Sequence, residues 1–301
     1  MEGNDIDKLT VYLQQVHKCY PNLEAKTTRL VDAGEFNDIF VVNEEIAFRF
    51  PTSPDGMWRL KVEVAVLGAM QDHVSVPIPN PIYVSEDLET VGAAFMGYRM
   101  LAGEPLRNHL ETLRAKGDHR RLAGQLAAFL QDLHGFPAAS AGLEVPVHDR
   151  GRREALPGLY QSFREHLYPH MRPDARDLVT NHFDVFLSNP ASFDYERVLK
   201  HGDLGPGNIL LDPQRWTLSG IIDFGSAGLD DPASDLGFVS FWGESLLGKP
   251  FVERLYGDYP MTESLLGRTR FFQVMSALMV ALGGLQGGDR ETFEMGLEQF
   301  V

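Results

Sequence analysis

The sequence has very little cysteine, since Cys19 is the only one in 301 residues. A single cysteine excludes an internal disulfide and a cysteine-ligated zinc site, and it suits a reducing compartment. Long hydrophobic runs are also missing, because no apolar stretch approaches the length needed to span a bilayer. The N-terminal segment "MEGNDIDKLT" is acidic and lacks the apolar stretch of a signal peptide. We therefore expect a cytoplasmic protein.

Positive charge is scarce as well, since 27 Lys and Arg stand against 42 Asp and Glu, a formal net charge of −15. An acidic surface repels phosphate backbones and anionic lipid, so nucleic acid and membrane surfaces are not expected partners. Residues 201–260 hold nine of the acids and three of the basic residues. This local excess favours a cationic small-molecule substrate, although a solvated acidic surface explains it equally well.

Apolar periodicity changes at "MLAGEPL", Met100–Leu106. Before this segment the pattern predicts helices at 6–21 and 60–73, a strand ending at 31, and further strands at 38–42, 46–50, 82–85 and 93–101. After it the pattern predicts short strands at 208–212 and 217–224, and helices at 120–136, 158–171, 174–190, 233–248, 265–284 and 290–301. We expect an α+β protein of two lobes, residues 1–101 and 102–301, and a monomer.

Two motifs carry the chemistry, "HGDLGPGN" at His201–Asn208 and "IIDFG" at Ile221–Gly225. An aspartate in a tight loop can accept the proton of a substrate hydroxyl, as Asp203 is placed to do. The amide oxygen of Asn208 and the carboxylate of Asp223 are the hard oxygen ligands that Mg²⁺ prefers. Phosphoryl transfer needs these parts, and the two motifs together indicate that reaction.

The paired motifs resemble the catalytic loop and metal-binding segment of the protein-kinase-like fold, in the Gly-for-Arg form of the aminoglycoside phosphotransferases. The resemblance implies a small N-terminal nucleotide-binding lobe with a mixed β-sheet and a larger, mainly helical catalytic lobe. It implies that Asp203 is catalytic, that Asn208 and Asp223 bind Mg²⁺, and that ATP or GTP is the phosphoryl donor. His201 and Asp235 would brace the catalytic loop.

The resemblance extends into the first lobe, where "IAFRF" matches the strand that carries a phosphate-binding Lys in the family. Here that position is Arg49, and Glu63 matches the acid that pairs with it, so we expect these two side chains to meet. An exposed Arg and an exposed Glu are the alternative. No G-x-G-x-x-G is present, and Gly34 alone stands in the nucleotide-covering loop.

The segment "MGYRMLAGEP" matches the link between lobes whose backbone binds the nucleotide base in the family. The resemblance places Tyr98 at the back of the base pocket and Arg99, Met100 and Leu101 along its edge. A large aromatic at this position is similar to the aminoglycoside 2″-phosphotransferases, several of which favour GTP. Core packing explains Tyr98 equally well, so ATP and GTP both stay open.

The expected acceptor is a small molecule rather than a protein. Gly202 replaces the Arg of regulated protein kinases, and no A-P-E segment follows Asp223. An aminoglycoside suits the acidic chain, and family acids that hold ammonium groups follow the metal motif and lie near the C-terminus. The candidates here are Asp231, Glu244 and Glu294, with Asp289, Glu291 and Glu298 as neighbours, and each is also explained as a solvated acid.

Three alternatives to an aminoglycoside substrate stay open. Phe241 and Trp242 stand where the 2″-phosphotransferases are richer in acids, which favours a more apolar acceptor and hence a macrolide phosphotransferase. A metabolic kinase acting on choline, homoserine or a sugar is the second. A binding module without activity is the third, but such a module would be expected to lose Asp203 or Asp223, and both are present.

Overall fold

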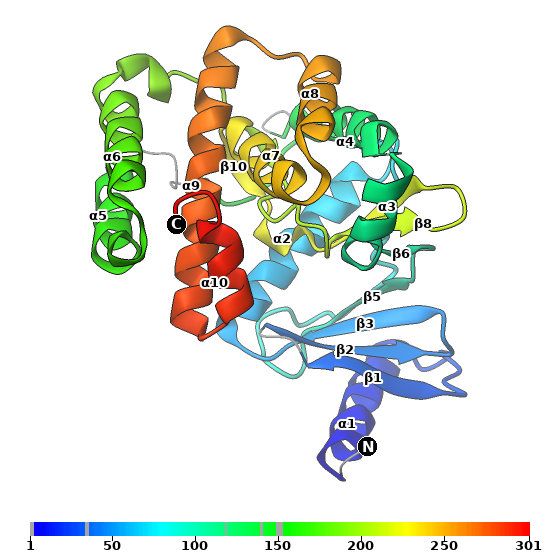
Figure 1. The fold of residues 1–301 in the computed structure, drawn as a ribbon. Helices are drawn as coiled ribbons and strands as arrows, with labels where there is room; N and C mark the ends of the chain where they lie inside the picture. The colour runs from blue at the N-terminus through cyan, green and yellow to red at the C-terminus, as the bar shows by residue number, and fades with distance from the viewer. Residues whose placement is uncertain (1–2, 34–35, 118, 139–140, 149–152) are drawn as a thin grey trace.

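The computed structural model describes residues 3–33, 36–117, 119–138, 141–148 and 153–301. Its N-terminal part contains a five-stranded antiparallel sheet in the order β1-β2-β3-β5-β4 (Figure 1). The strands are β1 (Thr28–Ala33), β2 (Asn37–Val42), β3 (Ile46–Pro51), β4 (Tyr83–Val84) and β5 (Met96–Arg99). The predicted hairpin is β2–β3, in which Ile39 pairs with Arg49.

Two helices flank this sheet on different sides. Helix α1 (Gly3–Cys19) packs Tyr12 against Phe40 and Phe50 of the sheet. Helix α2 (Pro54–Met70) lies between the sheet and the helical part of the molecule (Figure 1). It begins earlier than predicted, because Ser53 caps its first turn by accepting the Gly56 N–H (3.1 Å) and a proline occupies the first helical position. Its buried residues belong to the same hydrophobic cluster as those of the helical part, so this helix connects both parts of the protein.

The rest of the chain is mainly helical, so the predicted α+β class is confirmed. Its helices are α3 (Leu110–Lys116), α4 (His119–His134), α5 (Leu156–His166), α6 (Pro173–Ser188), α7 (Ala233–Leu247), α8 (Lys249–Asp258), α9 (Glu263–Gly287) and α10 (Arg290–Leu297). Single turns are η1 (Leu106–His109), η2 (Tyr168–His170), η3 (Pro190–Phe193) and η4 (Phe224–Ser226). The strands are β6 (Glu104–Pro105), β7 (Val198–Lys200), β8 (Ile209–Asp212), β9 (Thr217–Ile221) and β10 (Gly228–Asp230). The boundary at 101/102 falls between β5 and β6 and stays a prediction.

Helix α9 is the central helix of this part and packs against both α7 and α10 (Figure 1). Within the described ranges, it is the one helix whose length and composition would allow it to cross a membrane. The expectation that no stretch approaches that length is therefore wrong. Of the most apolar 18-residue stretch of this helix, 56% is buried inside the protein, as is usual for a core helix.

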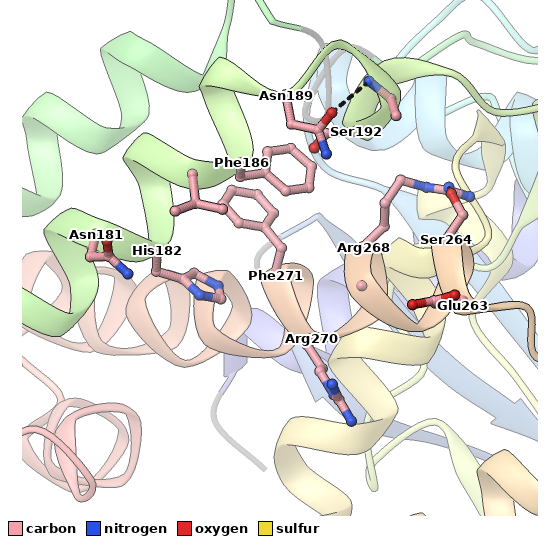
Figure 2. Close-up of a pocket in the computed structure, with 13 residues that line it drawn as sticks. Asn181, His182, Phe186, Asn189, Ser192, Glu263, Ser264, Arg268, Arg270 and Phe271 are labelled. Carbon is pink, nitrogen blue, oxygen red and sulfur yellow. Dashed lines mark hydrogen bonds between the residues drawn. The ribbon is translucent and has the colours of Figure 1, made fainter.

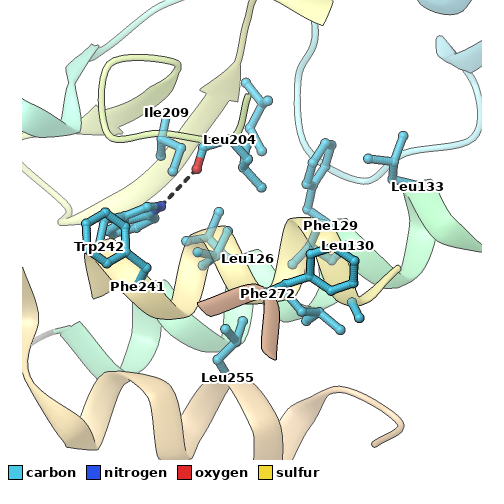
Figure 3. Packing of buried hydrophobic residues seen from close by; sticks show 14 of the residues in the cluster. Leu126, Phe129, Leu130, Leu133, Leu204, Ile209, Phe241, Trp242, Leu255 and Phe272 are labelled. Carbon is cyan, nitrogen blue, oxygen red and sulfur yellow. Dashed lines mark hydrogen bonds between the residues drawn. The ribbon is translucent and has the colours of Figure 1, made fainter. Parts of the chain in front are cut away.

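The hydrophobic core lies directly beneath the predicted catalytic loop (Figure 3). Leu126 and Phe129 of α4 pack there with Leu204 of the loop. The indole nitrogen of Trp242 on α7 donates to the Leu204 carbonyl (2.9 Å). Leu204 and Phe129 are fully buried, so the residue next to Asp203 is anchored in the core.

Candidate active site

The predicted catalytic loop runs from the end of β7 to the start of β8. Asp203 is exposed on it, and the Asn208 amide nitrogen donates to the Asp203 carbonyl (2.9 Å) and carboxylate (3.2 Å). Backbone hydrogen bonds from the Gly205 N–H to the Asp203 carbonyl and from the Asn208 N–H to the Gly205 carbonyl tighten the loop. The Asp203 carboxylate and the Asn208 amide are therefore held in fixed positions relative to each other. The surrounding protein raises the pKa of Asp203 by desolvation.

Two buried side chains brace this loop. The Asp235 carboxylate accepts the backbone N–H groups of His201 (2.7 Å) and Gly202 (2.9 Å). The His201 ring accepts the Asp203 N–H at Nδ1 (3.2 Å). Although burial acts to raise it, the hydrogen bond and charge of His134 hold the pKa of Asp235 well below its usual value. An ionised Asp235 thus fixes the backbone on the N-terminal side of Asp203, as a bracing residue would.

Asp223 follows β9 in the left-handed region, with φ at 68°. Such strained backbone in a residue other than glycine concentrates at functional sites. Its carboxylate accepts a hydrogen bond from Arg49 Nη2 (3.1 Å), and although burial acts to raise it, this charge lowers the pKa of Asp223. The neighbouring Ile222 N–H donates to the Asn208 carbonyl (3.0 Å), and the Ile222 carbonyl accepts from His201 Nε2 (3.1 Å). The two motifs therefore form one site.

The predicted contact between Arg49 and Glu63 is confirmed. Arg49 Nη1 donates to Glu63 Oε1 at 3.0 Å, and both side chains are buried. The same oxygen of Glu63 accepts the Phe224 N–H (3.2 Å). Burial raises the pKa of Glu63 to about 7, against the opposing charge of Arg49. Arg49 consequently joins the sheet to helix α2 and, through Asp223, to the predicted metal-binding segment.

Of the remaining nucleotide-site predictions, Gly34 lies outside the described residues. Tyr98 is buried in the main hydrophobic cluster, so the core-packing alternative describes its surroundings. Burial raises the pKa of its phenol to about 12, and the phenol stays neutral near the Arg49 charge. Its contact with a base stays a prediction.

The segment after β5 offers fewer free groups than predicted. Arg99 and Glu45 form an exposed ion pair (3.4 Å), and the Met100 N–H donates to the Glu45 carbonyl (2.8 Å). The Met100 N–H is therefore not free to bind a nucleotide base. The Leu101 side chain packs so close to Gly220 that a Cβ there would come within 2.8 Å of it. Any base contact here falls to other backbone groups of this segment.

The side chains present at the site fit a magnesium nucleotide. Asn208 uses its amide nitrogen in both hydrogen bonds to Asp203, which leaves its amide oxygen as a ligand atom. Asp223 adds an ionised carboxylate, and Mg²⁺ is commonly held by one or two carboxylates together with substrate phosphates. Arg49 Nη2 lies 3.1 Å from Asp223 Oδ1, so the guanidinium places a positive charge next to the carboxylate expected to bind the metal.

A cavity of about 170 Å³ opens beside Asp203. Its lining is mainly apolar and comprises Leu159, Lys200, Gly202, Asp203, Ser234, Asp235, Phe238, Phe272, Met275, Ser276, Met279 and Val280. Pockets that bury most of a drug-sized ligand are larger, roughly 300–1,000 Å³. This cavity therefore suits one ring or substituent of a larger acceptor.

The predicted substrate acids are not gathered at this cavity. Glu244 accepts a hydrogen bond from Gln273 (2.7 Å) and lines a separate cavity of about 230 Å³ together with Glu298. Glu294 is exposed and paired with Arg290 (2.7 Å) one helical turn away. The neighbouring candidates also have positions of their own: Asp289 caps α10 by accepting the N–H groups of Glu291 and Thr292, and Glu291 is exposed.

The structure corrects the prediction for Asp231. This carboxylate is fully buried and pairs with Arg268, with Nε 2.6 Å from Oδ2 and Nη2 3.3 Å from Oδ1. It also accepts the Ala233 N–H (3.0 Å). With its oxygens turned inward, Asp231 holds the start of α7 and is not available to a substrate.

Replacing Asp231 therefore tests this correction. We expect Asp231→Asn to lower the free energy of unfolding by about 3–5 kcal/mol, because it leaves Arg268 buried without its carboxylate. The substrate KM of the folded fraction should stay unchanged. The matched control is Glu294→Gln, which breaks an exposed pair worth about 1 kcal/mol or less. Urea unfolding and steady-state kinetics measure both, and a raised KM in a variant of native stability would restore the substrate role.

The inference drawn from Trp242 is also corrected, whereas the one drawn from Phe241 stays a prediction, because Phe241 lines the same cavity as Glu244. Both are buried, and Trp242 packs beneath the catalytic loop through its bond to Leu204 (Figure 3). Trp242 therefore does not indicate whether the acceptor is apolar. The apolar residue of α7 that does face the cavity beside Asp203 is Phe238.

A further cavity, of about 580 Å³, lies between the second half of α6, η3 and the first turns of α9 (Figure 2). Stacked rings of Phe186 and Phe271 stand in its wall, with His182 stacked on Phe271. Arg268 also lines it and is committed to Asp231. Its lining contains none of the predicted site residues.

Sequence reasoning missed Arg59 and Ser226. Arg59 Nη1 donates to the Ser226 hydroxyl (2.6 Å), immediately after the Asp223–Gly225 turn. A signal was available, because Arg59 precedes Glu63 by four residues and the two share one face of a helix.

Comparison with known proteins agrees with this site. The model of the phosphotransferase enzyme family, APH, matches residues 27–271 and so spans both motifs, Arg49 and Glu63. The chain belongs to this family. As a phosphotransferase it transfers a phosphoryl group from a nucleotide donor to a hydroxyl group.

Named relatives of this phosphotransferase are antibiotic kinases. The viomycin phosphotransferase of Streptomyces vinaceus is 25% identical over 282 residues, which cover 90% of this chain and 91% of that protein. The GDP and kanamycin complex of APH(2″)-IIIa superposes with a TM-score of 0.75 at 28% identity, covering 96% of each chain. The GDP complex of wild-type aminoglycoside 2′-phosphotransferase-IIIa gives a TM-score of 0.77 at 27% identity, covering 97% of this chain and 96% of that one.

Proposed function

We propose that this phosphotransferase transfers the γ-phosphoryl group of GTP or ATP to a hydroxyl of an aminoglycoside antibiotic, with Mg²⁺ as cofactor. The observation that carries the reaction is the single site formed by Asp203, Asn208, Asp223 and Arg49. The substrate class is supported by the relation to the kanamycin-bound and GDP-bound structures and by the net charge of −15.

The residues of the chain divide the work of the transfer. Asp203 accepts the proton of the attacking hydroxyl, while Asn208 holds the carboxylate in position. Asn208 and Asp223 hold Mg²⁺, which when bound neutralises charge on the phosphate oxygens. Arg49 adds a fixed cation to the same face.

A macrolide is the second candidate acceptor, and one observation favours it. The cavity beside Asp203 is walled by Phe238, Phe272, Met275 and Met279, and its two acids are Asp203 itself and Asp235, which is bonded to the loop backbone. Such a wall buries apolar surface better than it pairs ammonium groups.

A coupled assay of nucleotide hydrolysis separates these candidates. ATP and GTP are each combined with kanamycin, a macrolide, viomycin and small alcohols such as choline and homoserine, in the presence of Mg²⁺. The proposal predicts stimulation by kanamycin. Stimulation by the macrolide alone would replace the substrate class, and stimulation by a small alcohol alone would replace the antibiotic role.

A further inference from the structure

Arg59 contacts two segments that lie far apart in the sequence. Its Nη1 donates to the Ser226 hydroxyl at 2.6 Å, and its guanidinium stands over the Phe36 ring, 4.3 Å from the ring centre. Phe36 belongs to the end of the loop between β1 and β2, and Ser226 directly follows the Asp223–Gly225 turn. One side chain of α2 thus contacts both the β1–β2 hairpin, whose loop is the predicted nucleotide-covering loop and which is called the nucleotide-covering hairpin below, and the residue that follows the predicted metal-binding segment.

The position of α2 makes this contact close. Gly225 packs so tightly on α2 that a Cβ there would come within 3.2 Å of Arg59 Cβ. On the hairpin side, the Phe36 carbonyl accepts the Thr52 N–H (2.9 Å) and lies against Gly56, where a Cβ would collide with it. The Arg59 side chain is therefore close to both partners. Its planar guanidinium can donate to Ser226 and stack on Phe36 at the same time.

Ser226 extends the connection to the catalytic loop. Its backbone carbonyl lies directly against Gly202, so a Cβ at residue 202 would collide with it. Gly202 has a φ of 81°, in the left-handed region that glycine adopts without strain, and it precedes Asp203. Contacts therefore run without a gap from Arg59 through Ser226 and Gly202 to Asp203.

We propose that Arg59 is a positioning residue that fixes the nucleotide-covering hairpin, the loop of Asp203 and the Asp223–Gly225 turn in their active arrangement. The bond to Ser226 is made within the unmodified chain, so this arrangement needs no added phosphate. Arg59 acts through Ser226 and Phe36 rather than on the substrate. The inference rests on the proposed roles of Asp203 and Asp223, but it does not depend on which antibiotic accepts the phosphate.

Kinetics of Arg59→Met test this role. The kcat should fall about 10–100-fold, the usual loss when a partner that orients a functional group is removed. The nucleotide KM should stay within about twofold, because no ground-state contact to the nucleotide is lost. Arg59→Lys keeps a donor for Ser226 but not the planar head, and it should recover part of kcat. Arg120→Met is the control, since Arg120 is exposed and has no hydrogen bond or ion pair among the described residues.

Amide hydrogen exchange supplies a readout that needs neither substrate nor metal. In Arg59→Met, exchange should quicken at the Thr52 N–H, which bonds Phe36, and at the Ala227 N–H, which bonds the Phe224 carbonyl (3.0 Å). In Ser226→Ala only the Ala227 amide should respond. A wild-type kcat in Arg59→Met, or a raised nucleotide KM with kcat unchanged, would overturn the proposal. Unchanged exchange at both amides would overturn it even if no substrate is identified.

Discussion

Asp203→Asn should lower kcat by about 10²–10⁴-fold, the range that general-base catalysis contributes. The substitution keeps the shape of the side chain and the turn at Gly205, but it removes the carboxylate that we propose takes the hydroxyl proton. Substrate KM should change little, because the lost interaction belongs to the transition state. Steady-state kinetics with the best acceptor of the hydrolysis screen measure both quantities.

The matched control for this prediction is Asp212→Asn. Asp212 ends β8, the strand that follows the loop of Asp203, and pairs with Arg215 (2.9 Å), outside the site. This control should retain the wild-type kcat. Asp203→Asn with near wild-type turnover and native stability would remove Asp203 from the mechanism.

The acidic limb of the pH profile gives the same residue a second test. Desolvation raises the pKa of Asp203 above the ordinary aspartate value of 3.8. A base works only when deprotonated, so kcat/KM, which reports the free enzyme, should be retained above the raised pKa and fall as the pH drops through it. An acidic limb below pH 3.8 in an enzyme that remains folded would contradict this assignment.

Asp223→Asn should raise the Mg²⁺ concentration for half-maximal activity by at least about 10–100-fold. Loss of a residue that only supports a metal ligand typically costs this much, and Asp223 is expected to contact the metal itself. The change replaces an anionic ligand by a neutral amide and removes the charge that faces Arg49. The variant should stay folded, since Arg49 keeps its bond to Glu63.

The prediction for Asp223→Asn is measured as the initial rate at increasing Mg²⁺ concentration and saturating nucleotide, with Asp212→Asn again as control. Wild-type magnesium dependence in the variant would show that Asp223 is not a ligand. A lower kcat with unchanged magnesium dependence would assign Asp223 to orienting Arg49 instead.

The sequence predicted most of the fold because its periodic segments are also the buried ones. Helix α4 was expected at 120–136 and occupies His119–His134, with Leu122, Leu126 and Leu130 inward. Helix α7 likewise agrees with its predicted range to within one residue. Helix α8 was missed, because it begins with Lys249 and Pro250 directly after Gly248, and a Gly-Lys-Pro sequence is typical of a break between elements.

Within the site, residues inside local motifs were predictable and those joined only by the fold were not. The spacing of Asp203 and Asn208 fixes their hydrogen bond, because one tight loop contains both. Asp231 looked like an exposed acid because its partner, Arg268, lies 37 residues away on helix α9. Ser226 likewise gains its role from Arg59, 167 residues earlier. Partners at such separations are set by packing, which a single sequence does not reveal.

Mass spectrometry of kanamycin after incubation with the protein, Mg²⁺ and GTP or ATP tests the central claim most directly. The account predicts a product heavier by one phosphoryl group, formed by the wild-type protein and by Asp212→Asn but not by Asp203→Asn. Unmodified kanamycin in every reaction, together with a phosphorylated macrolide or small alcohol from the same protein, would contradict the proposed substrate. Phosphorylated kanamycin formed equally by Asp203→Asn would contradict the proposed mechanism.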